Sequence, residues 1–234
     1  MGRTMGFYDL RDAMAQPGCP VCRLKADAVD RFIDTLLWEN VNDPGARRDI
    51  RQARGFCHQH AWELIQGGAS SGSVIILRDV VQHVLAVLEN ARLEPAMPVP
   101  FFRRTQPAAA AEMAAELAPQ VPCPVCARAE MAESISITTL IEGLPGESGL
   151  LEAYRASEGL CLPHLRRALS TARDPAVAAA LVETQIAIWR RLEAHLSEII
   201  RKLDYRFREE PRGEEVGAAV RAVAAMSGWR DRTK

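Results

Sequence analysis

The chain has 234 residues, of which 48% are hydrophobic and 25% charged, and its formal net charge is −1. This length allows one sizeable core or two smaller domains, and the composition is that of an ordinary globular protein. The near-neutral charge balance gives no support for binding to a nucleic-acid backbone or to an anionic membrane surface.

The first residues, MGRTMGFYDLRDAM, contain no apolar run suited to a signal peptide. The longest apolar stretches, at 74–88 and 176–188, are interrupted by charged or amide side chains, and we expect both to be too short and too polar to span a bilayer. The sequence therefore predicts a cytoplasmic protein. Thiols stay reduced in that compartment, so cysteine pairs there indicate metal or redox chemistry rather than structural disulfides.

The first half of the chain predicts a series of helices, since apolar residues recur at i, i+3 and i+4 spacing between clusters of turn formers. These expected helices cover 7–15, 22–39, 46–53, 58–65 and 73–93. The segment that follows, 95–108, contains four prolines and has no periodicity. It is typical of a linker.

The second half predicts a similar series of helices, at 109–118, 126–140, 150–157, 163–170 and 175–207. The tail, 208–234, is polar, with one short amphipathic helix expected at 216–226. No alternating run is long enough to predict a strand, so the expected fold class is all-α.

A cysteine motif occurs twice and uses all six cysteines of the protein. Its first copy consists of Cys19, Cys22, Cys57 and His60, and its second of Cys123, Cys126, Cys161 and His164. Every one of these positions is offset by 104 residues between the copies. A C-x2-C pair with a C-x2-H pair is a known metal-ligand spacing, because residues three positions apart can reach one ion.

The simplest architecture is an internally duplicated helical bundle, with pseudo-symmetric repeats at 5–94 and 109–207. We expect each repeat to hold its own Cys3His metal site, which would fix the start of one helix to the start of another. A swapped arrangement, in which Cys19 and Cys22 meet Cys161 and His164, has the same ligand count. The spacing alone leaves both arrangements open.

Zinc is the preferred metal, with two ions per chain, because thiolate and imidazole ligands in a tetrahedron suit it. A Cys3His-ligated iron–sulfur cluster is an alternative, although this spacing is less typical of one. Thiol redox chemistry at the CPVC pairs is another, but it normally belongs to a βαβ context, which the sequence does not predict. The last alternative is buried or disulfide-bonded cysteines without metal, and the histidine at the fourth position of both copies argues against it.

Other polar residues carry weaker signals. Asp79 and His83 lie four residues apart on one helix and could share a metal, but the second copy has Glu183 and Ala187 there, which favours a surface or capping pair. The segment 201–208, RKLDYRFR, is basic, as expected near the C-terminus of a helix.

The doubled CPVC motifs, with CHQH and CLPH after them, resemble a prokaryotic family known only as a domain of unknown function, number 6062. The DYRF sequence at 204–207 is a second and weaker marker of that resemblance, which extends from about Tyr8 to Trp229. The resemblance implies no activity, cofactor or partner.

The sequence therefore predicts a zinc-binding, non-enzymatic scaffold or regulatory protein that is stabilised by metal. The runner-up is a thiol- or metal-based redox sensor or oxidoreductase that uses the CPVC pairs. An enzyme with a site between the repeats, near Asp204 and Tyr205, ranks third. A protein partner and the oligomeric state stay open; the composition favours neither a membrane nor nucleic acid as a partner.

Overall fold

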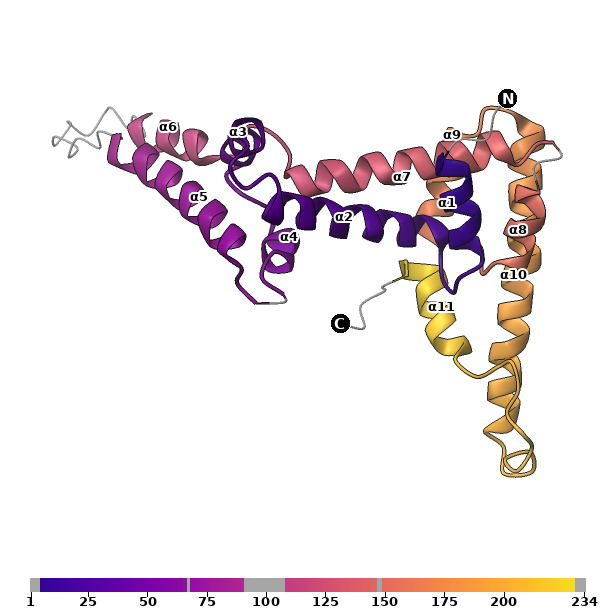
Figure 1. Cartoon of the computed structure of the whole chain (residues 1–234). Coiled ribbons are helices and arrows are strands. Elements are labelled where there is room, and N and C mark those ends of the chain that lie inside the picture. Colours follow the sequence, from indigo (N-terminus) through magenta and orange to yellow (C-terminus); the bar gives the residue numbers. More distant parts are fainter. Residues whose placement is uncertain (1–4, 67, 91–107, 147–148, 230–234) are drawn as a thin grey trace, which may run out of the picture. The chain divides into compact units, whose positions relative to one another are not determined.

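A computed structural model describes residues 5–66, 68–90, 108–146 and 149–229 (Figure 1). Throughout these residues the regular structure is helical, with no strand, which confirms the all-α fold class. The helices are α1 (Met5–Met14), α2 (Pro20–Trp38), α3 (Pro44–Gln52), α4 (His58–Glu63), α5 (Ser71–Asn90), α6 (Ala108–Leu117), α7 (Pro124–Gly143), α8 (Leu150–Ala156), α9 (Leu162–Thr171), α10 (Pro175–Lys202) and α11 (Ala218–Ser227).

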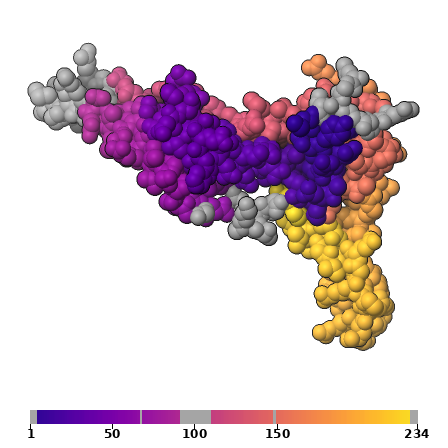
Figure 2. Space-filling model, in the orientation of Figure 1, coloured from indigo at the N-terminus to yellow at the C-terminus, as the bar shows by residue number. Residues whose placement is uncertain are grey.

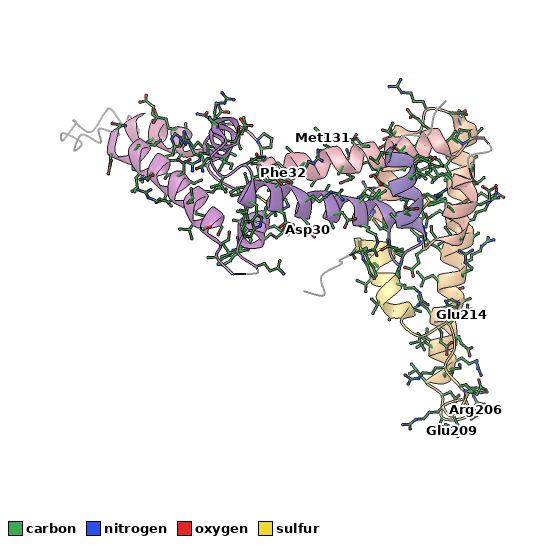
Figure 3. The ribbon with its side chains drawn as sticks, viewed as in Figure 1. Asp30, Phe32, Met131, Arg206, Glu209 and Glu214 are labelled. Atoms are coloured by element: carbon green, nitrogen blue, oxygen red, sulfur yellow. The ribbon has the colours of Figure 1, made fainter. Side chains whose placement is uncertain are left out.

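The predicted helices are present, and the largest difference in their bounds concerns α10. It ends at Lys202 rather than at 207. The reason is local, because Asp204 Oδ1 accepts a hydrogen bond from the backbone N–H of Arg206 at 2.9 Å, which favours a turn over a further helical turn. Arg206 lies on this turn beyond α10 (Figure 3). Most of the predicted linker, 95–108, lies outside the described residues.

Corresponding helices of the two predicted repeats begin 104 positions apart, as shown by α2 and α7, α4 and α9, and α5 and α10. The compact units of the structure nevertheless have other bounds. Unit 1 comprises residues 1–28 and 130–234, and unit 2 comprises 29–129. Their boundaries fall inside α2 and α7, so each unit combines parts of both predicted repeats. The duplication itself stays a prediction.

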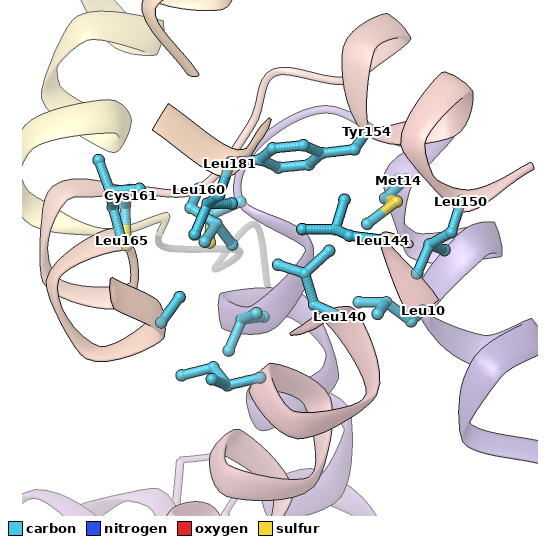
Figure 4. Close-up of a cluster of buried hydrophobic side chains, with 14 of the residues drawn as sticks. Leu10, Met14, Leu140, Leu144, Leu150, Tyr154, Leu160, Cys161, Leu165 and Leu181 are labelled. Carbon is cyan, nitrogen blue, oxygen red and sulfur yellow. The ribbon is translucent and has the colours of Figure 1, made fainter. Parts of the chain in front are cut away.

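Unit 1 has a continuous apolar core that includes two of the cysteines. In Figure 4, Leu10 and Met14 of α1 lie with Leu140 of α7 and Tyr154 of α8 in this core. Cys161 belongs to the same cluster and is only 1% exposed. The start of α9 is therefore fixed within the core.

The C-terminal part of unit 1 also packs on this core. The chain reverses after α10, and α11 contacts both α10 and α9 (Figures 1 and 2). Trp229 then packs against Gly18, where an added Cβ would lie 2.4 Å from the indole ring. Gly18 has a φ of 86°, so this position needs glycine both for its conformation and for the close approach.

Unit 2 has two smaller apolar clusters. One joins Val29 and Ile33 of α2 to Val125 of α7, and Phe32, on the same helix, packs against it (Figure 3). The other consists of Leu36, Val41, Ile50 and Ile76.

Helix α5, in unit 2, is apolar for an exposed helix. Among the described residues it alone is long and apolar enough, by length and composition, to cross a membrane, with a mean hydropathy of 1.5 over an 18-residue window of which 17% is buried. By this measure the expectation that 74–88 is too short and too polar does not hold, because the helix extends to both sides of that stretch. One such helix is weak support for a span, and its Asp79 is ion-paired with Arg51 of α3.

Candidate metal centres

The eight predicted ligand residues form two clusters of three cysteines and one histidine, and in each cluster the possible ligand atoms lie within 4.8 Å of one another. Site A consists of Cys19, Cys22, Cys161 and His164 and lies in unit 1. His164 Nδ1 is 3.3 Å from Cys19 Sγ, 3.4 Å from Cys22 Sγ and 3.1 Å from Cys161 Sγ. The thiols of Cys22 and Cys161 are 3.7 Å apart.

Site B consists of Cys57, His60, Cys123 and Cys126 and lies in unit 2. His60 Nδ1 is 3.2 Å from Cys57 Sγ, 3.8 Å from Cys123 Sγ and 3.3 Å from Cys126 Sγ. Its geometry repeats that of site A, with Cys57 and Cys126 Sγ 3.5 Å apart.

The grouping corrects the preferred sequence hypothesis, which assigned one site to each repeat. The C-x2-C pair of each predicted repeat instead meets the C-x2-H pair of the other. The lengths of the helices explain this. From Cys22 to its end at Trp38, α2 carries the chain about 24 Å away, and the 9 residues of α3 cover only about half that length before Cys57.

Each cluster lies where helices begin, as the sequence predicted. Cys57 and Cys161 are the N-cap residues of α4 and α9, and Cys19 and Cys123 directly precede α2 and α7. Neither N-cap cysteine makes a side-chain capping hydrogen bond, which leaves its Sγ directed to the cluster. The positive ends of the helix dipoles favour thiolates at these positions.

A carboxylate lies behind the histidine of each cluster. His164 Nε2 is 3.4 Å from Glu133 Oε1, and Glu133 also accepts hydrogen bonds from Lys25 Nζ and Arg167 Nη1, both at 2.8 Å. In site B, His60 Nε2 is 3.8 Å from Glu63 Oε2. Metal-bound histidines commonly have such a carboxylate partner, because it holds the ring and raises the basicity of the ligating nitrogen. The sequence reasoning missed both residues; Glu63 could have been found from its place three residues after His60.

Two further contacts hold the cysteine loops of site A. The backbone N–H of Trp229 lies 3.3 Å from Cys22 Sγ, to which it donates. Gln185 is 1% exposed, and its Oε1 accepts hydrogen bonds from the Tyr154 hydroxyl and, at 3.0 Å, from the N–H of Leu160. Leu160 directly precedes Cys161, so Gln185 fixes the loop that presents this ligand.

The thiols of each cluster differ in proton affinity. Burial raises the pKa of Cys19, and burial followed by hydrogen bonding to Cys57 raises that of Cys126 to about 12. Hydrogen bonds from Cys19 and Cys22 lower the pKa of Cys161. For Cys57, burial raises the pKa, but the neighbouring backbone of His60 and the thiols of Cys126 and Cys123 lower it by more. A metal that needs three thiolates therefore displaces protons from these clusters, and its binding weakens as the pH falls.

The weaker candidates of the sequence do not form sites. Asp79 accepts two hydrogen bonds from Arg51, while His83 is bonded to Arg54, so this pair shares no metal position. Tyr205 is 84% exposed and Asp204 is bonded to Arg206, in an open turn.

Both clusters fit a tetrahedral metal ion. Zn–S bonds of about 2.3 Å and Zn–N bonds of about 2.0–2.1 Å imply ligand-to-ligand distances of about 3.5–3.8 Å. The eight distances given above run from 3.1 Å to 3.8 Å. The donor set of three sulfurs and one imidazole suits zinc and fills its coordination.

Comparisons with known proteins place the chain in a family without assigning it an activity. The model of a family of unknown function, DUF6062, matches residues 1–233. An "Uncharacterized 23.9 kDa protein in xynA 3'region" from Caldicellulosiruptor sp. (strain Rt8B.4) is 41% identical over 64 residues, which are 27% of this chain and 31% of that protein. The match thus spans less than a third of that relative, and no solved structure matches. The extent of the family match, which covers both metal clusters, shows that the chain belongs to the family of unknown function DUF6062.

Proposed function

We propose that sites A and B each bind one zinc ion and that the chain is a non-enzymatic, metal-stabilised interaction protein of the cytoplasm. The observation that carries the proposal is the complete ligand set at both clusters. Each brings three Sγ atoms around a histidine Nδ1, with a carboxylate on the Nε2 side. Four protein ligands leave zinc no open position for a substrate, which is the pattern of structural sites rather than catalytic ones.

The stabilising role follows from the positions of the ligands. Site A links the start of α2 to that of α9 across 139 residues between Cys22 and Cys161, and site B links α4 to α7 across 69 residues between Cys57 and Cys126. Closing such long loops costs chain entropy, and the metal-ligand bonds supply the compensating free energy. Structural zinc contributes about 10–16 kcal/mol in small peptides, comparable to the whole stability of a typical domain.

The interaction role rests on the surface. Several large apolar side chains are exposed in unit 2, among them Trp38 at 76%, Trp62 at 62% and Val81 at 56%. Aromatic side chains are enriched in protein interfaces, and we assign these exposed groups to contacts with a protein partner.

Elemental analysis of the protein, purified without added metal, tests the zinc assignment. We expect two zinc ions per chain, and loss of the helical circular dichroism signal on prolonged chelation. A brown protein that contains iron would contradict the assignment, and so would a metal-free protein with full helix content and six freely titrating thiols.

A redox role is the second candidate, and the partial exposure of Cys57, Cys123 and Cys126 favours it at site B. Hydrogen peroxide would oxidise two thiolates to a disulfide, yielding two hydroxide ions and releasing the metal. Zinc release by micromolar peroxide that a dithiol reverses would support this function. Release only at damaging concentrations would exclude it.

A further inference from the structure

Unit 2 contains a second group of polar and charged side chains, none of which belongs to site B. A cavity of about 250 Å³ is lined by Arg48, Arg51, Gln52, Arg54, His83, Val87 and Gln120. Three of these seven residues are arginines, and none is acidic. A cavity of this size is below that of drug-sized ligand sites and has room for a small polar molecule of a few heavy atoms.

The charges of this cavity are only partly balanced. Asp79 accepts hydrogen bonds from Arg51 at 2.8 Å and 2.6 Å, and it also lies 3.6 Å from Arg47. Arg48 is 70% exposed, and its nearest carboxylate is Asp49, at 3.9 Å. Within the described part of the chain, Arg54 has no carboxylate in salt-bridge distance. The cavity is therefore positively charged.

Arg54 is held in place by neutral groups and by its backbone. Its Nε donates to the backbone carbonyl of Glu116 at 3.0 Å, and its Nη1 lies 2.6 Å from His83 Nε2. Because a guanidinium can only donate, His83 Nε2 is the acceptor of this hydrogen bond. Arg54 is also the one non-glycine with a positive φ in the described residues, at 55°. Arg54 directly follows the C-cap of α3, and this conformation lets the N–H of Gly55 donate to the Ile50 carbonyl at 2.8 Å, as at many helix ends.

The other predicted repeat shows that the fold does not need these arginines. At the positions 104 residues later, Arg48 and Arg54 are replaced by Glu152 and Glu158, and His83 by Ala187. Glu158 there has a packing role, since its Oε2 accepts the N–H of Gly18 at 2.8 Å. The helices begin at equivalent places in both halves, so the basic cluster belongs to unit 2 alone and is not a requirement of the helical architecture.

We propose that this cavity binds the phosphate groups of a small phosphorylated molecule. Arg48 is the main hydrogen-bonding residue, and Arg54, whose guanidinium already donates to Glu116, Arg51 and His83, contributes mainly its positive charge. Guanidinium groups pair with phosphate oxygens through two parallel N–H bonds, which the exposed Arg48 side chain is free to turn toward the cavity. Arg51 also lines the cavity. Its Nε and Nη2 donate to Asp79, so it contributes mainly its charge.

Titration calorimetry of the full, zinc-loaded chain with pyrophosphate and with inorganic phosphate tests the proposal at low ionic strength. We expect saturable binding of one pyrophosphate per chain, tighter than that of phosphate. Arg48→Ala and Arg54→Gly should each weaken pyrophosphate binding about tenfold or more, the first through loss of a charge-assisted hydrogen bond and the second through loss of a positive charge beside the ligand. Glycine takes a φ of 55° without strain, so Arg54→Gly should keep the helix content and both zinc ions.

Arg155→Ala is the matched control, because Arg155 is the exposed counterpart of Arg51 in unit 1, and it removes the same charge from a residue that does not line the cavity. It should leave pyrophosphate binding unchanged. The proposal is overturned if the wild-type chain gives no saturable heat, if folded Arg48→Ala and Arg54→Gly bind as tightly as the wild type, or if Arg155→Ala weakens binding to the same degree.

Discussion

Unit 1 and unit 2 hold the same set of ligands in different surroundings. In site A, Cys19, Cys161 and His164 are buried, and Cys161 belongs to the main apolar core. In site B only His60 is buried, and its three cysteines are partly exposed. The same pattern of residues can therefore form part of an apolar core in one unit and, in the other, a site that water and small reagents can reach.

Substitution of the equivalent cysteine in each unit should give the largest difference between the two sites. In Cys161→Ser, site A loses a buried thiolate that water cannot replace, so we expect unit 1 to lose its zinc and unfold. The folding free energy that zinc supplies, about 10 kcal/mol, is of the order of a domain's whole stability. In Cys57→Ser, water can take the vacant position, and zinc should remain with weaker affinity. Zinc content and helical circular dichroism of the two variants measure the difference; equal losses would contradict it.

Gln185 offers a sharper test within unit 1, because the equivalent residue of unit 2 is the exposed Val81. Gln185→Ala leaves two buried donors, the Tyr154 hydroxyl and the Leu160 N–H, without their acceptor. Each unsatisfied group costs about 1–3 kcal/mol, and the vacated volume adds to this, so we expect unit 1 to lose about 3–5 kcal/mol. Val81→Ala should change stability by less than about 0.5 kcal/mol. Urea denaturation of both variants provides the measurement, and similar midpoints would contradict the assigned role.

The helices, and the cysteines and histidines that gather in the two clusters, could be predicted from the sequence, whereas the way these residues pair could not. Apolar spacing and turn formers are local signals, which is why the starts of α2, α4, α7 and α9 were found. The pairing of the ligands depends on how far α2 carries the chain, and C-x2-C and C-x2-H spacings are the same in either arrangement. Glu133 and Gln185 were missed for a related reason: their roles arise from contacts with residues far along the chain.

The carboxylates behind the two histidines should also distinguish the units. Glu133→Gln removes the charge that lies 3.4 Å from His164 Nε2 and leaves Lys25 and Arg167 without this partner. Such carboxylates typically account for about 10–100-fold in metal affinity, so we expect site A to weaken by that factor in competition with a chelator. Glu63→Gln should have a smaller effect at site B, where the separation is 3.8 Å.

Glu130→Gln is the control for Glu133→Gln. Glu130 also pairs with Arg167, but it is 63% exposed, and no contact joins it to His164 in the described structure. It should leave zinc affinity unchanged. If Glu130→Gln weakens site A as much as Glu133→Gln does, the effect comes from Arg167 and not from the histidine.

The smallest expected effect concerns an ion pair that unit 2 has and unit 1 lacks. Hydrogen bonds from Arg51 lower the pKa of Asp79, which is 15% exposed, whereas its counterpart Glu183 is exposed and has no ion pair among the described residues. Asp79→Asn should destabilise unit 2 by about 1–2 kcal/mol at pH 7, and Glu183→Gln should have almost no effect. Because the folded pKa is the lower one, the contribution of Asp79 is complete above its unfolded value of about 3.9 and is lost as the pH falls through the folded value. The difference in urea midpoint between wild type and Asp79→Asn should therefore be constant from pH 7 to pH 5 and shrink below about pH 4. A difference that widens in acid would show that the ion pair with Arg51 does not cause it.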